Sequence, residues 1–464
     1  MHRILLLLAA GGAALAPIGF AACTRGDPSQ VDPPITWPDG APPEQTYDAN
    51  VPRFCDLPGS VVNDGAGKQR VVPGAKGLPD LSWLSVPSGF CAHFFAIVPN
   101  ARSLRFAPGG ELFVTSPSRG TTGGGAGGKS AILVLTDENK DGLADSSNAP
   151  FLTSLASTQG ILFANGFFYY QDDTKIMKLK YTAGDRTPKA SPVQVADLSG
   201  RYMSGVHWPK TLDIADDGTI YVANGSDQGE DTSDCTATRP FRGGTFAIEN
   251  GEPMNGTPIT KGYRNPIFVR CQKGHNLCFT SELTRDYSWN ERGREKLIPI
   301  RKGDDWGYPC CASKAVPFPD VSPTPDCSMV ADEKVAFYVA DTPFGFDFDY
   351  GKWPKPWSNR VFVALHGQFG TWIGARIVAV ETDPTTGMPL TGGTLKPNGQ
   401  QGTNGAALDF ATGWDNGKLD HGRPSDITFG PDGRMFVTQD NGPNSVKNGE
   451  GIVLWFAPVD LAKQ

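Results

Sequence analysis

The sequence lacks several features that would place it in common functional classes. Its 464 residues contain no long apolar run beyond the extreme N-terminus, which excludes a protein with several membrane-spanning helices. Its 42 Lys+Arg are outnumbered by 49 Asp+Glu and form no basic block, so we expect no nucleic-acid partner. The C-x-x-C and C-x-x-C-H patterns of zinc and haem sites are absent. Outside the N-terminus no segment keeps a 3.6-residue apolar period, which argues against long helices.

Glycine and proline, by contrast, are abundant. The chain has 56 Gly and 39 Pro, about a fifth of its residues, whereas globular proteins average about 12% and unstructured low-complexity chains reach about 25–30%. Hydrophobic residues make up 39% of the chain, enough for a large core. The composition indicates a folded protein that is rich in turns.

The N-terminus has the layout of a secretory signal peptide. Arg3 precedes an apolar stretch that ends in small residues before Cys23, and Gly and Pro interrupt it too often for a spanning helix. The sequence Phe-Ala-Ala-Cys resembles the bacterial lipobox, whose cysteine is lipidated; an ordinary signal peptide with a chance cysteine is the alternative. We expect a lipoprotein signal peptide (1–23), a Pro-rich extended tether (24–50) and an exported domain (51–464). The lipid on Cys23 would anchor the protein at the outer membrane or in the periplasm of a bacterium.

Cysteine parity supports export. One of the nine cysteines belongs to the lipobox, which leaves eight. An even number in an oxidising compartment predicts up to four disulfide bonds. Local spacing favours Cys271 with Cys278 across a short hairpin, and then Cys327 with either Cys310 or Cys311. The remaining pairings stay open.

A repeat predicts the fold. A short apolar strand, a Pro/Asp/Gly turn and a second strand recur six times, which is the chemistry of β-hairpins. The copies are residues 104–116, 161–172, 212–225, 268–282, 348–367 and 427–442. Six hairpin-centred units over this length predict an all-β fold, a six-bladed β-propeller with long inter-strand loops. The alternative is a set of unrelated hairpins in a pair of β-sandwiches.

The two ends of the domain are expected to close the propeller. Residues 91–98 (CAHFFAIV) and 451–458 (GIVLWFAP) both have the composition of strands. If they share the last blade, the ring is closed and no sheet edge is left exposed.

Two loops have the spacing of ligand sites. Residues 123–130 satisfy G-x-x-x-x-G-K-S, but a short strand follows where a phosphate loop needs a helix, so we interpret the segment as a hairpin loop. Oxygen-bearing side chains with the spacing of a calcium loop occur at Asp137, Asn139, Asp141 and Asp145. Position twelve of that loop is Asn148 instead of a glutamate, so a polar turn without metal is the alternative.

Several segments occur in the order found in one known family. They are PNARSLRFAPGGELFV, VHWPKTLDIADDGTIYV, GYRNPIFV, GDDWGYPCC, VFVALHG and HGRPSDITFGPDGRMFV. Together they span about residues 86–458 and resemble the dehydrogenases for glucose and sorbosone that depend on pyrroloquinoline quinone (PQQ), most closely the sorbosone branch. The resemblance implies a six-bladed propeller, in agreement with the number of repeats.

The resemblance also implies a catalytic site. His207 aligns with the family's catalytic histidine, which takes the proton of the substrate hydroxyl, because the ordinary pKa of imidazole is near neutral pH. A packed or surface histidine is the alternative. Asp227 resembles an aspartate that orients this histidine, although a turn-capping role fits it nearly as well. Arg264 and Asn265 match the pair that grips the cofactor, since guanidinium binds oxygen atoms in a fixed fork; a structural arginine at a blade edge is the alternative.

Further cofactor contacts follow from the same resemblance. Arg423 matches a ligand of a PQQ carboxylate, and Gln159 matches a glutamine that faces the cofactor or the substrate. His366 stands where the glucose-oxidising members have a lysine, and Ser425 stands where they have a second arginine. Two cationic contacts are therefore weaker in this chain than in those members.

We therefore expect an exported, lipid-anchored quinoprotein that oxidises a sugar or another alcohol or aldehyde. It would pass electrons to an external acceptor, a cytochrome or a quinone. The family's calcium-binding stretch, which uses main-chain carbonyls, aligns with Thr284 and Arg285, and calcium would polarise the quinone as a Lewis acid. The alternatives are a non-catalytic propeller that binds glycans or proteins and a calcium-dependent propeller hydrolase of the lactonase kind.

Overall fold

The fold is built almost entirely from β-strands. The computed structural model describes residues 53–65, 68–118, 129–145, 149–198, 207–226, 243–248, 258–285, 294–339, 341–368, 371–390, 403–404, 407–440 and 450–461. Within these ranges the only helical segment is one 3-10 turn, η1 (Phe54–Asp56). No helix in the described part of the chain is long and apolar enough to cross a membrane. The expected signal peptide and tether lie outside the described residues.

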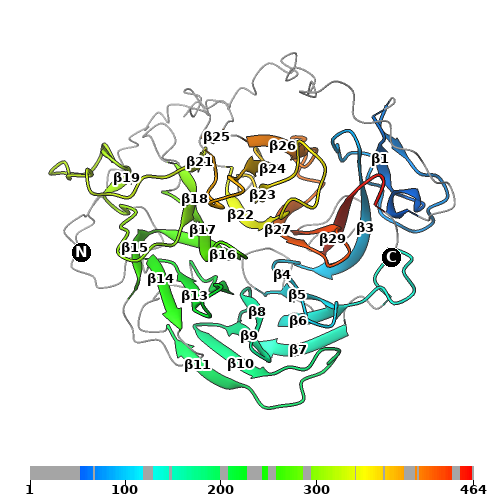
Figure 1. Cartoon of the computed structure of the whole chain (residues 1–464), viewed down its shortest axis with the longest axis horizontal. Helices are drawn as coiled ribbons and strands as arrows, with labels where there is room; N and C mark the ends of the chain where they lie inside the picture. Colours follow the sequence, from blue (N-terminus) through cyan, green and yellow to red (C-terminus); the bar gives the residue numbers. More distant parts are fainter. Residues whose placement is uncertain are drawn as a thin grey trace, which may run out of the picture. The chain divides into compact units, whose positions relative to one another are not determined.

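The strands of the described residues form six antiparallel sheets of four or more strands, and these are the blades of a six-bladed β-propeller (Figure 1). The innermost strands are β4 (Leu104–Phe106), β8 (Ile161–Ala164), β12 (Leu212–Ile214), β16 (Asn265–Gln272), β22 (Pro343–Phe348) and β27 (Arg423–Phe429). The second strands are β5 (Leu112–Ser116), β9 (Phe167–Asp172), β13 (Ile220–Asn224), β17 (Leu277–Leu283), β23 (Arg360–Leu365) and β28 (Met435–Asp440). The predicted fold class is confirmed.

Two further strands complete each blade. The third strands are β6 (Ser130–Leu135), β10 (Lys175–Lys180), β14 (Gly243–Ile248), β18 (Glu295–Pro299), β24 (Arg376–Glu381) and β29 (Glu450–Pro458). The fourth strands are β7 (Ala149–Leu155), β11 (Val193–Asp197), β15 (Thr260–Tyr263), β21 (Val335–Phe337), β26 (Ala407–Ala411) and β3 (Phe90–Pro99). Short additions are β1 (Val61–Asn63) and β2 (Arg70–Val71) beyond β3, β25 (Thr403–Asn404) beyond β21, and the separate hairpin of β19 (Cys311–Ser313) and β20 (Val316–Pro317).

The six innermost strands form a closed ring, because each contacts the innermost strand of the next blade and β27 contacts β4. A buried arginine holds part of this ring together. The Arg270 guanidinium in β16 donates to the Asp426 carboxylate of β27 at 3.0 Å and to the Leu104 carbonyl of β4 at 3.3 Å. Its Nε also donates to the Phe346 carbonyl of β22 at 2.8 Å. One side chain therefore joins four innermost strands.

All six predicted units overlap a hairpin that supplies the first and second strands of one blade, although the unit at 348–367 begins only at the last residue of β22. Local turn chemistry explains why the sequence reveals them. In the β12–β13 turn, Gly218 has a φ of +89°, which L-residues with a side chain rarely adopt. The Asp217 carboxylate accepts the backbone N–H of Thr219 at 2.9 Å, as turn aspartates commonly do.

The last blade is completed by both ends of the domain. Strand β29 pairs with β3 along its whole length, from Glu450 opposite Pro99 to Pro458 opposite Phe90 (Figure 1). A disulfide bond between Cys55 and Cys91 ties η1 to β3. The predicted closure of the ring is confirmed.

The other disulfides agree with the local predictions. Cys271 pairs with Cys278 across the β16–β17 turn, and Cys327 pairs with Cys311. Cys310 is disulfide-bonded as well, and Cys235 lies outside the described residues. Strand β6 begins at Ser130, directly after the glycine-rich segment, so a strand follows that segment as expected and the helix of a phosphate-binding loop is absent there.

Candidate active site at the start of the inner strands

Blade topology brings the predicted site residues to one end of the ring. The innermost strands begin at this end, and the antiparallel second strands finish there; we call it the start face. Gln159 precedes β8, His207 precedes β12, Arg264 precedes β16, Asn265 opens β16, Arg423 opens β27 and His366 follows β23. Asp227 lies outside the described residues, so its predicted role stays a prediction.

His207 contacts Ser226 through its Nδ1 atom. Nδ1 lies 3.2 Å from both the carbonyl oxygen and the hydroxyl oxygen of Ser226; a proton on Nδ1 is donated to the carbonyl, which can only accept, whereas the hydroxyl can also donate to an unprotonated Nδ1. With the proton on Nδ1 the Nε2 atom has a free lone pair, and it is buried without a hydrogen-bond partner among the described residues. Burial, together with the neighbouring Arg264 and Lys210 cations, lowers the pKa of His207 to about 3. The imidazole is thus neutral and able to accept a proton at Nε2.

Two neighbours hold His207 in place. A Cβ atom at Gly225 would lie 2.3 Å from the His207 Cβ, so only glycine allows the end of β13 to approach so closely. The buried ammonium of Lys210 donates to the carbonyl oxygens of His207 at 3.1 Å and of Trp208 at 3.2 Å. The turn that carries the histidine is therefore fixed from both sides.

Ser226 connects His207 with Arg264. The Ser226 carbonyl faces the imidazole, and its N–H donates to the Arg264 carbonyl at 2.8 Å. The Arg264 N–H in turn donates to the Glu282 carboxylate at 2.8 Å. Burial raises the pKa of Glu282 to about 7, even though Lys296 and Arg264 lower it. The candidate base and the candidate cofactor-binding arginine thus belong to one hydrogen-bonded unit.

A second buried cluster lies at the junction of the last two blades. The Arg423 guanidinium donates to the carbonyl oxygens of His366 at 2.8 Å and Gly367 at 2.6 Å. His366 Nε2 lies 3.0 Å from the Asp440 carboxylate, which can only accept, so Nε2 carries the proton. Arg102, from the segment before β4, also pairs with Asp440 at 3.0 Å. This cluster joins the first blade to the last two.

Burial shapes the charges of this second cluster. It lowers the pKa of His366 to about 3, with the Arg423 cation acting in the same direction. Burial alone would raise the pKa of Asp440, but His366 and Arg102 together hold it below its ordinary value. Asp440 is therefore an anion and His366 a neutral imidazole, stacked on the Phe344 ring at 3.9 Å.

Several buried polar atoms at the start face have no hydrogen-bond partner among the described residues. They are Thr158 Oγ1, His207 Nε2, Asn265 Oδ1, His366 Nδ1 and Ser425 Oγ. Buried polar groups are normally paired, because an unpaired one costs about 1–3 kcal/mol. Three of these atoms (His207 Nε2, Asn265 Oδ1 and His366 Nδ1) accept hydrogen bonds, so the hydroxyl groups of a sugar or alcohol would satisfy them, whereas the Thr158 and Ser425 hydroxyls can donate to the oxygens of a carboxylated quinone such as PQQ. Gln159 is less available to a ligand, since its amide donates to the Ile267 carbonyl at 3.5 Å.

In the stretch aligned with the family's calcium site, the arginine side chain is bound to another part of the protein. Thr284 and Arg285 follow β17 at the start face. The Arg285 guanidinium makes two 2.7 Å hydrogen bonds to the Asp320 carboxylate and lies over the Phe318 ring. The side chain of Arg285 is thus held by an ion pair and a ring contact, and the oxygens that this stretch offers to an ion are its main-chain carbonyls and the Thr284 hydroxyl. Calcium at this stretch stays a prediction.

The predicted calcium loop between β6 and β7 has the hydrogen bonds of a polar turn. Its side chains accept backbone N–H groups, from Gly142 to Asp137 (3.2 Å), from Asp141 to Asn139 (2.8 Å) and from Glu138 to Asp145. In the part of the chain that the structure covers, no three His, Cys, Asp or Glu side chains gather in a metal-binding arrangement. The arrangement favours the turn over a metal site, and a calcium ion there stays a prediction.

Sequence reasoning missed several side chains of the start face: Arg102, Lys210, Ser226, Glu282 and Asp440. Arg102 and Lys210 lie within the segments that carry the family resemblance, and they are the cations next to Asp440 and His207. A search for charged residues directly before each innermost strand would have found both. Asp440 ends β28 and Ser226 follows β13; both are second strands, and only the ring topology makes these residues neighbours of the others.

Comparisons with known proteins support the fold. A family model described as a domain of unknown function (DUF7133) matches residues 80–292, and no curated protein matches the sequence. A structure of the carbohydrate-active enzyme family AA12 from Trichoderma reesei has a TM-score of 0.62 at 16% identity, covering 83% of this chain and 100% of that chain. The PQQ domain of pyranose dehydrogenase from Coprinopsis cinerea has a TM-score of 0.59 at 15% identity, covering 82% and 99%.

The soluble aldose sugar dehydrogenase of Escherichia coli is also similar, with a TM-score of 0.53 at 13% identity over 80% of this chain and 99% of that chain. The chain has the fold of these proteins. At such identities the likeness extends to the arrangement of the blades, and the chemistry of the start face must be argued from its own residues.

Proposed function

We propose that the protein is an exported PQQ-dependent dehydrogenase that oxidises a sugar or another alcohol or aldehyde at the start face. The proposal rests on the state of the His207 Nε2 atom. This atom is buried and unpartnered among the described residues, and the lowered pKa keeps its ring neutral, so that with the proton on Nδ1 it can accept another. A side chain in that state is suited to remove the proton of a substrate hydroxyl group.

The chain offers groups of several kinds to hold the cofactor. Arg264 and Asn265 lie next to the candidate base, and the Arg423 side chain lies on the opposite side of the ring. The Thr158 and Ser425 hydroxyls can donate hydrogen bonds to carboxylate oxygens. When bound, PQQ supplies a quinone that accepts a hydride, and calcium increases its electrophilicity. The protein's own part is to orient the substrate and to take up the hydroxyl proton.

The test separates chemistry from cofactor binding. His207→Ala should still bind PQQ, measured by titrating the quinone absorbance of apo-protein with added calcium, because Arg264 and Arg423 remain. Its turnover should fall by about 10²–10⁴, the usual contribution of a positioned acid–base group. Arg264→Ala should lose PQQ affinity first and regain part of its activity with excess cofactor.

His275 provides a matched control, since it lies in the β16–β17 turn at the opposite end of the ring. His275→Ala should change neither the spectrum nor the turnover. The proposal is wrong if wild-type protein, given PQQ and calcium, shows neither a bound-quinone spectrum nor dye reduction with a panel of sugars and alcohols.

A second candidate is a propeller that binds glycans or proteins without catalysis. The hydrogen bonds of Arg423 favour this candidate. Two nitrogens of its guanidinium already donate to the carbonyl oxygens of His366 and Gly367 instead of facing a cofactor carboxylate. Ser425 adds no cation at the position where the glucose-oxidising members have one. Glycan binding without any quinone spectrum would support this candidate.

A further inference from the structure

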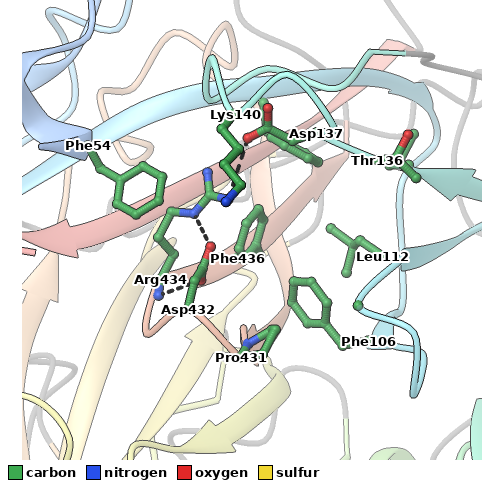
Figure 2. Close-up of a pocket in the computed structure, with 13 residues that line it drawn as sticks. Phe54, Phe106, Leu112, Thr136, Asp137, Lys140, Pro431, Asp432, Arg434 and Phe436 are labelled. Carbon is green, nitrogen blue, oxygen red and sulfur yellow. Dashed lines mark hydrogen bonds and ion pairs between the residues drawn. The ribbon is translucent and has the colours of Figure 1, made fainter. Parts of the chain in front are cut away.

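A cavity lies away from the start face. It has a volume of about 310 Å³ and lies between the first and last blades, where Figure 2 shows its lining residues. Gly110 in the β4–β5 turn and Pro431 in the β27–β28 turn both line it. These turns connect the ends of innermost strands to the starts of second strands, so the cavity is at the end of the blades opposite the candidate active site.

Phenylalanine rings form part of the cavity wall. Four phenylalanines line it: Phe54, Phe95, Phe106 and Phe436. The Phe436 ring contacts Phe95 and Phe106 edge-on, with ring centres 5.1 and 5.2 Å apart, so these side chains fix one another in position. Rigid aromatic walls with a few polar groups are typical of small-molecule sites, and this volume is at the lower end of their range.

Arg434 is one of four charged residues that line the cavity, with Asp137, Lys140 and Asp432. Its guanidinium lies over the Phe54 ring at 4.2 Å, and its Nε donates to the Asp432 carboxylate at 2.7 Å (Figure 2). The residue is only 6% exposed, yet its Nη1 has no hydrogen-bond partner in the described part of the chain. A buried charged donor without an acceptor is costly. An oxygen atom of a ligand in the cavity would satisfy it.

The charged groups around Arg434 determine whether a charged or an uncharged ligand oxygen can bind to it. Two carboxylates already face the guanidinium, Asp432 at 2.7 Å and Asp137 at 3.6 Å. Lys140 also lines the cavity, so its two cations and two carboxylates balance, and a further anion would add an uncompensated charge whose desolvation is unfavourable. A carbonyl oxygen accepts the hydrogen bond without adding charge.

We propose that this cavity binds a small uncharged molecule with a flat apolar body and a carbonyl oxygen, which accepts a hydrogen bond from Arg434 Nη1. The phenylalanine rings would pack on the flat body, and the guanidinium would fix its orientation. The site is separate from the start face, so the proposal does not depend on the proposed dehydrogenase activity.

Three probes of similar size test the proposal by calorimetric titration of the whole protein: the neutral benzamide, the anion benzoate and the cation benzylamine. Benzamide should bind saturably, and benzoate at least about fivefold more weakly, because its charge must be desolvated in a cavity whose own charges already balance. Benzylamine, which has no acceptor oxygen, should also bind more weakly than benzamide. Arg434→Met keeps the stem over Phe54 but removes the donor, so benzamide affinity should fall about tenfold, the cost of losing a hydrogen bond to a charged group.

Arg70→Met serves as the control, because Arg70 is an exposed arginine on β2 that does not line the cavity. If Arg434→Met does not fold, Phe106→Ala replaces it, since removing one wall should also weaken benzamide binding severalfold. The proposal is overturned if benzamide gives no saturable binding to the wild type, or if the variant that folds binds it as well as the wild type does. Tighter binding of benzoate or benzylamine than of benzamide would also overturn it.

Discussion

Burial determines the proton affinity of His207. A histidine in water has a pKa of about 6.5, but burial and the neighbouring cations lower that of His207 to about 3. The folded protein therefore keeps this imidazole neutral at pH values at which the unfolded chain binds a proton. This group therefore destabilises the folded protein at low pH: the free energy of unfolding decreases as the pH falls from about 6.5 to the pKa of His207 in the folded state. Above that pH its contribution is constant.

The same shift predicts the pH dependence of the reaction. An ordinary histidine base would make kcat/KM fall about tenfold per pH unit below about pH 6.5, which is what the ordinary pKa of imidazole suggests from the sequence. With the lowered pKa, we expect kcat/KM to show no step from this group between about pH 5 and 8. Dye-reduction assays across this range, with circular dichroism at each pH to verify folding, would test this. A step centred near pH 6.5 that is absent in His207→Gln would contradict it.

At the scale of elements, the hairpins were predictable because their determinants are local. Each turn carries its own Asp, Asn or Gly, and alternating residues assign the two flanking strands to opposite faces. The neighbours of the site residues depend instead on ring closure. Arg102 and Asp440 meet only because the first blade lies beside the last. No local pattern indicates that pairing, nor the burial that makes His207 and His366 neutral.

The end of the β12–β13 hairpin offers a test of how an element positions the base. Gly225→Ala adds a Cβ atom that would lie 2.3 Å from the His207 Cβ, so either β13 or the histidine must move. A displacement of about 1 Å can lower turnover about 10²-fold, and we expect a loss of that size with PQQ binding largely kept. Turnover and the quinone spectrum would be measured together.

The other end of the same hairpin supplies the control. Gly218→Ala meets no atom within 4 Å, although its φ of +89° makes the substitution strained. It should therefore lower thermal stability while leaving the turnover of the folded protein unchanged. Equal turnover losses in the two variants would show that backbone strain, and not displacement of His207, accounts for the effect.

At the scale of the whole molecule, the chain folds back so that its first and last described strands complete one blade. The disulfide between Cys55 and Cys91 fastens the segment before β3 to that blade. The disulfides Cys271–Cys278 and Cys311–Cys327 lie within the fourth blade and the segment inserted into it. Such bonds persist in oxidising compartments, so they support the proposal that the protein is exported.

The N-terminal cysteine allows a test of membrane anchoring. If Cys23 carries the lipid, the wild-type protein should sediment with membranes, because each buried CH₂ of an acyl chain contributes about 0.8 kcal/mol. Cys23→Ser should be released or incorrectly processed, whereas Thr24→Ser, which keeps the cysteine, should remain membrane-bound. Fractionation with mass spectrometry of the mature N-terminus measures both properties. Wild-type protein that is unmodified and cleaved at another bond would contradict the anchor, and the start face would then act in a freely diffusing propeller.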